Sequence, residues 1–105
     1  MDQKTAFELV KRYVHFLAEQ DLNVEKAYIF GSYAKGTFRE ESDIDVAVFM
    51  KNLENSFTMQ VQLMQMRRNF DTRIEPHPFD ENDFNSGNPF VNEILRTGIP
   101  VFEKG

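Results

Sequence analysis

The stretch that decides the fold is KAYIFGSYAKGTFREESDIDVAVFM, which occupies residues 26–50. Its opening residues, Lys26–Phe30, predict a short buried strand that Gly31 ends. The polar segment that follows predicts a loop with one helical turn after Ser32. The alternating segment Asp43–Met50 predicts a second strand, with its even-numbered apolar residues facing the core. We therefore expect two strands joined by a polar, glycine-containing loop.

The loop contains the kinds of residue that hold phosphate groups. A glycine lets backbone amides approach a ligand closely, and free amides at a helix start attract anions. Ser32 adds a hydroxyl donor and Lys35 adds a cation one turn later. We expect Gly31, Ser32, Lys35 and Gly36 to bind a nucleoside triphosphate, together with Ser42. The alternatives are that Lys35 is a solvated loop lysine and that Ser42 only orients the loop.

Two aspartates, Asp43 and Asp45, lie two residues apart at the start of the second strand. Residues at this spacing project from the same face of a strand, while Ile44 points to the core. Neighbouring carboxylates repel each other unless a cation neutralises them, and Mg²⁺ prefers oxygen ligands completed by phosphate and water. The pair therefore predicts metal-assisted nucleotidyl transfer. A solvated strand face is the alternative, and the scarcity of aspartate in strands argues against it.

Two helices are predicted on either side of this stretch in the sequence. The first has an apolar face at helical spacing, formed by Phe7, Val10, Val14 and Leu17. The second covers about residues 55–68. Its expected core-facing stripe consists of Phe57, Val61 and Met64, with Leu63 beside them.

The remaining elements complete an alternating order of helices and strands. A third strand is expected over roughly residues 72–77, at a sheet edge or ending there because Pro76 lacks an amide hydrogen. Asn88-Pro89 predicts a helix start and Gly98 its end, before a last strand over residues 99–102. The order predicts an α/β (α+β) fold, a mixed sheet of about four strands covered mainly on one face by helices.

Length, charge and composition limit the classes of function. The 105 residues predict a single domain spanning residues 1–105, and the absence of cysteine excludes disulfides and thiolate metal sites. A net charge of −5 makes nucleic acid an unfavoured partner, although it is compatible with a metal-bound nucleotide. No apolar run is long enough to span a membrane and no signal-peptide pattern is present, so we expect a soluble cytoplasmic protein.

These motifs are similar to those of a known family. Gly31-Ser32, Gly36 and Ser42-Asp43-Ile44-Asp45 resemble the signature of the DNA polymerase beta nucleotidyltransferase superfamily. The short length resembles its minimal nucleotidyltransferase (MNT) branch. The resemblance implies the nucleotidyltransferase fold and a Mg²⁺-dependent enzyme that transfers AMP from ATP to an acceptor hydroxyl.

The resemblance also implies a third carboxylate on a later strand. Glu75 is the candidate, as the third metal ligand and as the base that takes the proton of the attacking hydroxyl. Asp71 is the alternative, and the family more often has an aspartate at this position. Alternation places His77 on the face of Glu75, where it either assists the reaction or is a partly buried, hydrogen-bonded histidine.

Minimal members of the family are often paired with a helical HEPN-type toxin. The resemblance therefore implies that this protein acts as an antitoxin, in the manner of members that add AMP to a tyrosine of the toxin. Two alternatives remain: a binding module that neutralises a toxin by contact, and a nucleotidyltransferase that acts on a small molecule or a nucleic acid. The sequence leaves the acceptor, the nucleobase preference and the oligomeric state open.

Overall fold

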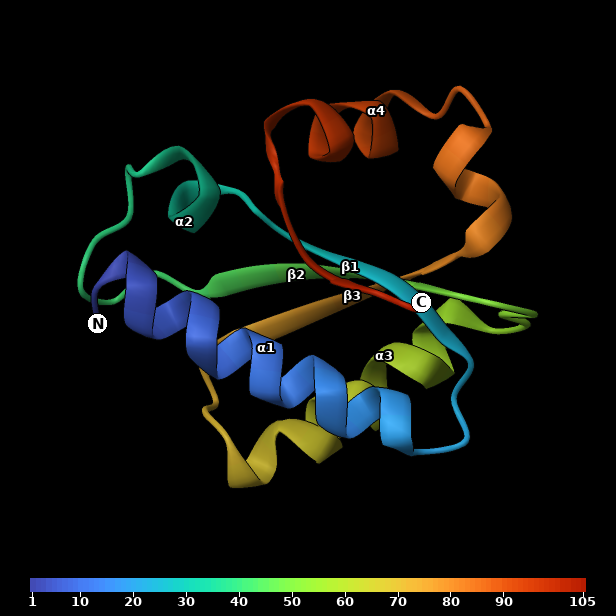
Figure 1. Ribbon diagram of the computed structural model, residues 1–105, viewed down its shortest axis with the longest axis horizontal. Coiled ribbons are helices and arrows are strands. Elements are labelled where there is room, and N and C mark those ends of the chain that lie inside the picture. Colours follow the sequence, from blue (N-terminus) through green and yellow to red (C-terminus); the bar gives the residue numbers. More distant parts are fainter.

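A mixed four-stranded sheet lies at the centre of the molecule (Figure 1). The computed structural model describes residues 1–105. In chain order the strands are β1 (Val24–Phe30), β2 (Ile44–Met50), β3 (Ile74–Asp80) and β4 (Ile99–Glu103). They are arranged β3-β2-β1-β4, with β1 antiparallel to both of its neighbours and β2 parallel to β3. The predicted mixed sheet is confirmed, and β3, which contains Pro76, is an edge strand as expected.

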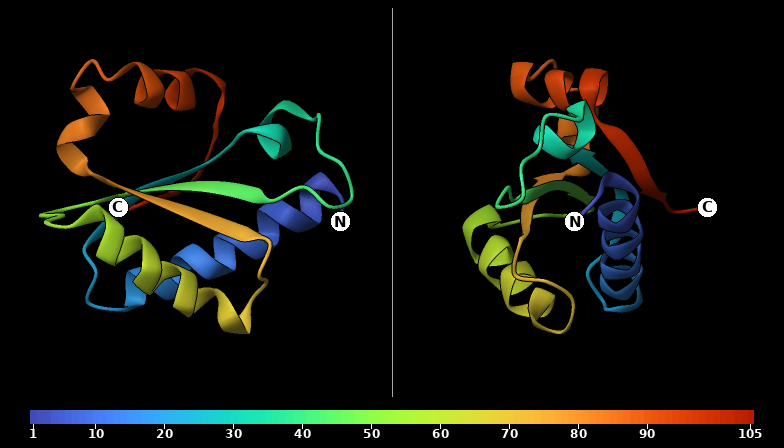
Figure 2. Two further views of the ribbon diagram at one scale, coloured as in Figure 1. Left: turned by 180° about the vertical axis from the view of Figure 1, so that it is seen from behind. Right: turned by 90° about the vertical axis from the view of Figure 1, so that its left-hand side faces the viewer.

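Helices lie on both faces of the sheet, and the larger core is on one of them (Figure 2). α1 (Gln3–Glu19) and α3 (Ser56–Met66) cover one face, where 17 buried residues form a continuous cluster. α4 (Pro89–Thr97) lies over the opposite face, where its Val91 and Ile94 form a cluster of four buried residues with Ala47 and Phe49 of β2. The predicted cover, mainly on one face, is therefore confirmed. None of the helices combines the length and apolar character needed to cross a membrane.

Short helical turns fill the connections, and polar caps begin the longer helices. The turns are α2 (Ser32–Lys35), η1 (Arg67–Asn69) and η2 (Glu81–Asn85). The Asn88 side chain accepts hydrogen bonds from the first amides of α4, which confirms the predicted helix start. α4 ends at Gly98, where an added Cβ atom would lie 2.9 Å from the Ile29 carbonyl oxygen. Glycine is therefore needed there because the chain passes close to β1.

The prediction for the packing face of α3 is wrong. Phe57, Val61 and Met64 are 75%, 41% and 36% exposed, whereas Leu63 is fully buried. Met59 and Met66 pack against the core from the same side of the helix as Leu63. Apolar residues occur on both sides of α3, so their periodicity does not distinguish the side that meets the sheet from the outer side.

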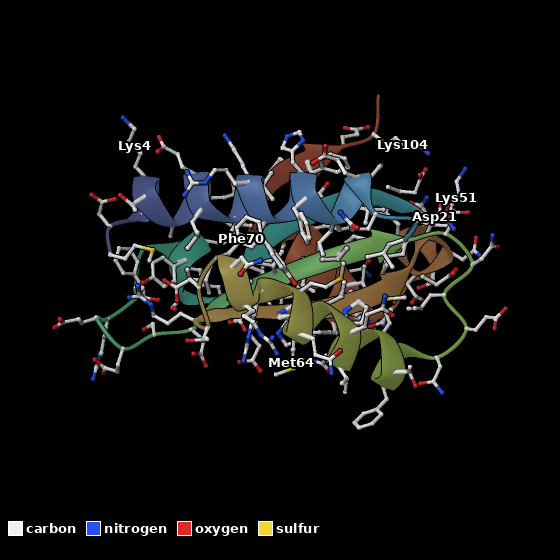
Figure 3. All side chains as sticks on the ribbon, turned by 90° about the horizontal axis from the view of Figure 1, so that it is seen from below. Lys4, Asp21, Lys51, Met64, Phe70 and Lys104 are labelled. Carbon is white, nitrogen blue, oxygen red and sulfur yellow. The ribbon has the colours of Figure 1, made fainter.

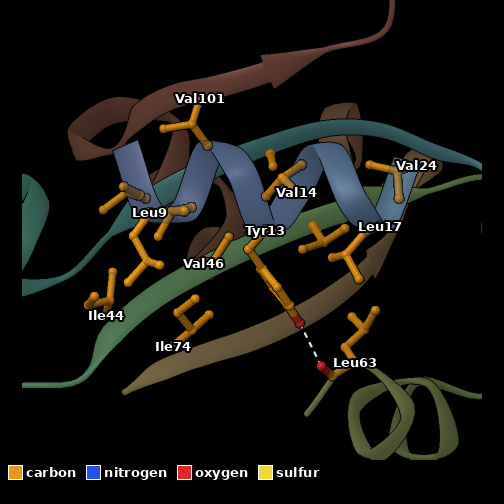
Figure 4. Close-up of a cluster of buried hydrophobic side chains, with 14 of the residues drawn as sticks. Leu9, Tyr13, Val14, Leu17, Val24, Ile44, Val46, Leu63, Ile74 and Val101 are labelled. Atoms are coloured by element: carbon orange, nitrogen blue, oxygen red, sulfur yellow. Dashed lines mark hydrogen bonds between the residues drawn. The ribbon is translucent and has the colours of Figure 1, made fainter. Parts of the chain in front are cut away.

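A buried hydrogen bond joins the two helices that cover the main core. The Tyr13 hydroxyl of α1 donates to the Leu63 carbonyl oxygen of α3 at 2.6 Å (Figure 4). Leu63 lies near the C-terminal end of α3, and its carbonyl oxygen has two lone pairs, so it can accept from a side chain. Burial raises the pKa of the Tyr13 phenol above its ordinary value. The hydrogen bond therefore gives the buried hydroxyl a partner and connects α1 to α3.

We expect Tyr13→Phe to lower the free energy of unfolding by about 1 kcal/mol, because it removes a buried hydrogen bond between two helices. Urea unfolding followed by circular dichroism measures this change. Tyr28→Phe is the matched control, because the Tyr28 hydroxyl makes no hydrogen bond within the protein, and its expected effect is below about 0.5 kcal/mol. Equal effects of the two substitutions would contradict the structural role of the Tyr13 hydroxyl.

Candidate active site

The acidic side chains predicted for the site meet on the sheet face beneath α4. In the parallel pairing of β2 with β3, Asp45 is opposite Glu75 and Ala47 is opposite His77. Paired residues of adjacent strands share a face, so Asp45, Glu75 and His77 project together. Ala47 packs in the cluster under α4, which identifies this face as the one opposite the main core.

Asp45 is held between two neighbouring segments. Its Oδ1 atom lies 3.2 Å from His77 Nε2, and its Oδ2 atom lies close to the position that a Cβ atom of residue 31 would occupy. A Cβ atom added to Gly31 would be 2.7 Å from that oxygen. Gly31 also has φ +73° and ψ −148°, a conformation restricted to glycine. The turn after β1 therefore approaches the Asp45 carboxylate as closely as only a glycine allows.

His77 is half-buried and hydrogen-bonded, in agreement with one of the two sequence interpretations, but its partner is a predicted site residue. The ring contacts Asp45 and also packs edge-to-face against Phe30, with ring centroids 5.2 Å apart. Because the carboxylate accepts, His77 donates from Nε2 in this arrangement. The alternation in β3 indicated the shared face, but no signal in the sequence named Asp45 as the partner.

The predicted helical turn after Ser32 is present and begins at Gly31. The Gly31 carbonyl oxygen accepts from the amides of Ala34 and Lys35 at 3.1 Å. Gly36, in the left-handed region at φ +77°, ends the turn and donates its amide to the Ser32 carbonyl oxygen. The loop therefore presents the half-buried Ser32 next to the Gly31–Asp45 contact, while Lys35 and Gly36 are exposed.

The Ser42 hydroxyl has a structural partner. It accepts from the Arg39 amide at 2.7 Å and closes the loop just before β2. Tyr33, fully buried, supports the same loop by stacking on Phe38 with ring centroids 4.3 Å apart. Asp43 directly follows Ser42 and is exposed, one residue before β2 begins. The loop thus places Asp43 at the edge of the site and Asp45 at its centre.

The structure separates the two candidates for the third carboxylate. Asp71 forms a two-pronged ion pair with Arg73, with distances of 2.9 Å to the Nη2 atom and 3.2 Å to the Nε atom. These hydrogen bonds lower the pKa of the Asp71 carboxyl below its ordinary value. Glu75 takes part in no ion pair and is opposite Asp45 in the sheet. The geometry therefore favours Glu75.

The available oxygen donors suit a partly solvated magnesium ion better than a fully enclosed metal. No group of three or more His, Asp or Glu side chains is close enough to hold a metal ion by protein ligands alone. Asp45 and Glu75 nevertheless offer carboxylate oxygens on one face of the sheet, and Asp43 offers another just before β2 begins. Mg²⁺ is commonly bound by one or two carboxylates, with phosphates and water completing its shell. The donor set fits such an ion.

We expect Gly31→Ala to lower the free energy of unfolding by about 3 kcal/mol, because the methyl group meets Asp45 and the backbone conformation becomes strained. Gly36→Ala is the matched control: Gly36 also has a positive φ, but nothing lies within 4 Å of an added Cβ atom. Its expected cost is about 1 kcal/mol. Denaturant titration of both variants measures the difference, and equal losses would contradict a close contact between Gly31 and Asp45.

Known proteins resemble this chain over most of its length. A candidate protein adenylyltransferase from Methanocaldococcus jannaschii is 28% identical over 81 residues, which cover 74% of this chain and 79% of that protein. The crystal structure of a candidate nucleotidyltransferase from Sulfolobus solfataricus matches 97% of this chain and 84% of its own, at a TM-score of 0.73 and 22% identity.

A chain of a toxin–antitoxin complex solved with AMP-PNP has the same fold, with a TM-score of 0.62 and 19% identity. The match covers 90% of this chain and 73% of that one. The family model described as polymerase beta, nucleotidyltransferase matches residues 12–105. That match includes the Gly31–Gly36 turn, the aspartate pair and Glu75, and on this basis the chain belongs to the polymerase beta nucleotidyltransferase family.

Proposed function

We propose that this protein is a metal-dependent nucleotidyltransferase that transfers AMP from ATP to a hydroxyl group on a partner protein. The observation that carries the proposal is the position of Asp45, which lies against the Gly31 turn, contacts His77 and is opposite Glu75. A phosphate-binding turn and two carboxylates at one point of a sheet provide the groups required for phosphoryl chemistry assisted by a metal ion.

Each predicted residue then has a defined role. The start of the Gly31–Gly36 turn binds the triphosphate through its first amides, because the later amides are hydrogen-bonded within the turn. The Ser32 hydroxyl and the Lys35 ammonium are further donors. Ser42 keeps the loop closed behind them through its bond to Arg39. Asp43, Asp45 and Glu75 would hold Mg²⁺, which when bound offsets the negative charge that develops on the phosphate oxygens.

The transfer itself is a substitution at the α-phosphorus of ATP. Glu75 accepts the proton of the acceptor hydroxyl, whose oxygen forms a bond to the α-phosphorus. The bond from that phosphorus to the bridging oxygen of pyrophosphate breaks, and pyrophosphate leaves with the electron pair. The acceptor retains AMP. Glu75 suits the role of base because no cation within the protein pairs with its carboxylate.

Two kinds of observation support a protein as the acceptor. The M. jannaschii relative is named as a candidate protein adenylyltransferase, and a structural neighbour belongs to a toxin–antitoxin complex. In this chain, Phe90 is 51% exposed and packs against Phe30, which in turn contacts His77. This exposed ring is connected to His77 through Phe30, and we propose it as a point at which an acceptor polypeptide docks.

The partner that fits best is a toxin of the HEPN type, with this protein acting as its antitoxin by modifying it. The alternative is a binding module that neutralises the toxin by contact. The two proposals differ in what the aspartates do: catalysis requires both carboxylates, whereas neutralisation by contact does not.

We expect Asp45→Asn to reduce AMP transfer by about 10²-fold or more, because an amide is a poorer ligand for the metal. The assay combines labelled ATP, Mg²⁺ and the co-expressed partner protein, and mass spectrometry detects the AMP added to the partner. Asp21→Asn is the matched control, an identical change at an exposed aspartate outside the site. If the Asp43→Asn, Asp45→Asn double variant protects against the toxin as well as the unaltered protein does, the binding-module alternative holds.

His77 acts in this proposal as a positioning residue for Asp45. We expect His77→Leu to raise the Mg²⁺ concentration needed for half-maximal transfer by about tenfold, because hydrogen bonds to a ligating carboxylate support metal binding. His77→Gln keeps an N–H donor and should recover part of the loss. A Mg²⁺ titration of the transfer rate separates this effect from a loss of turnover at saturating metal. Unchanged Mg²⁺ dependence in His77→Leu would contradict the role.

A further inference from the structure

α3 has apolar side chains on both of its sides. Leu63 faces the core, while Phe57, Val61 and Met64 form an outer stripe that is exposed. Figure 3 shows α1 and α3 side by side, with Phe70 between them and Met64 on the side of α3 away from α1. The stripe residues are spaced four and then three positions apart, the spacing at which one helix packs along another.

The surroundings of the outer stripe resemble the centre of a protein interface. The segment Asn55–Met66 contains no charged residue, although 28% of the whole chain is charged. The centres of protein interfaces are depleted in charge and enriched in phenylalanine and methionine. The outer stripe therefore has the composition of a surface that is covered in solution.

Two unpaired charges of opposite sign flank α3: Glu54 precedes its N-cap Asn55, and Arg68 lies in η1 after it. Glu54 is seven residues before Val61, and Arg68 is seven residues after it. Both are exposed, and neither takes part in an ion pair within the protein. If a second copy of the segment runs in the opposite direction with its Val61 beside this Val61, the Glu54 of each copy comes opposite the Arg68 of the other.

We infer that the outer stripe is a homodimer interface, in which α3 packs antiparallel against α3 of a second copy about a two-fold axis at Val61. A two-fold contact uses the same patch on both copies, so the patch must complement itself. In this arrangement Glu54 of each copy faces Arg68 of the other, and Phe57 of each lies beside Met64 of the other. The two Val61 side chains meet on the axis.

The shape of the surface agrees with this arrangement. A shallow hollow on the outer side of α3 is lined by Phe57, Thr58, Val61, Gln62 and Gln65, and Val61 is at its middle in the sequence. The hollow does not include Met64, so it lies beside the outer stripe, where it can receive a side chain of the second copy. Because the interface consists mainly of one helix from each copy, its area is small and the association should be weak.

The dimer leaves both candidate active sites accessible. α3 covers the main core, whereas Asp45 and Glu75 lie on the opposite face of the sheet, the face that α4 covers. Pairing through α3 therefore presents two outward-facing sites on one particle. The inference does not depend on the proposed function, because it rests on the surface of α3 alone.

Sedimentation equilibrium of the full chain from about 1 µM to 1 mM tests the inference, since this range covers the dissociation constants of weak complexes. The unaltered protein should shift from monomer to dimer within it. Val61→Asp should weaken association by about tenfold or more, because it buries two like charges on the axis. Lys11→Glu, on the exposed side of α1, is a control that should leave association unchanged.

A charge-reversal experiment tests the antiparallel arrangement itself. Glu54→Arg and Arg68→Glu should each weaken self-association by about tenfold, because each creates two like-charged pairs. An equimolar mixture of the two variants should associate as tightly as the unaltered protein, because both pairs across the axis are then of opposite charge. Glu8→Arg and Lys11→Glu are the matched reversals on α1, and circular dichroism verifies folding of every variant.

Three results would overturn the inference. The first is an unaltered protein that stays monomeric over the whole concentration range, in which case a different partner covers the stripe. The second is a dimer that Val61→Asp leaves equally tight, in which case the interface is elsewhere. The third is a mixture of the two charge variants that associates no better than either variant alone, which excludes the antiparallel register.

Discussion

The parallel pairing of β2 with β3 is the contact on which the rest of the structure depends. It sets Asp45 opposite Glu75, and both side chains point away from the main core. The neighbouring strand residues Ile44 and Ile74 face the helices and are fully buried. A shift of one residue in this register would exchange the two faces of β3, because side chains alternate along a strand. The apolar core and the reactive face are therefore maintained by the same hydrogen bonds.

Close approach of the backbone adds a second constraint at the same point. Gly31 ends β1 and begins the α2 turn, and its α-carbon lies against the Asp45 carboxylate. The carboxylate is thereby enclosed on one side by the turn and on the other by His77. Such an arrangement limits the motion of Asp45 before any ligand binds, which lowers the entropic cost of assembling a site for a metal and a nucleotide.

Function in this fold is divided between its two faces. The face under α4 contains the carboxylates and the exposed ring of Phe90, so nucleotide and acceptor meet there in the proposed reaction. The face under α1 and α3 contains the main core, and the outer side of α3 adds a surface suited to a second copy. Association through α3 and transfer beneath α4 can therefore occur together without competing for the same surface.

The sequence by itself determined the strands, the turn after Ser32, the start of α4 and the acidic pair, because local spacing and turn residues control these features. Glu75 was proposed as the third carboxylate from the resemblance to the family, and alternation placed it on the same face as His77. Only the tertiary structure showed that Asp71 is paired with Arg73 whereas Glu75 is unpaired opposite Asp45, and only it joined His77 to Asp45. The tertiary structure also showed that the side of α3 expected to face the core is exposed, and that Leu63 faces the core instead. These outcomes depend on contacts between distant segments, which the periodicity of one segment does not encode.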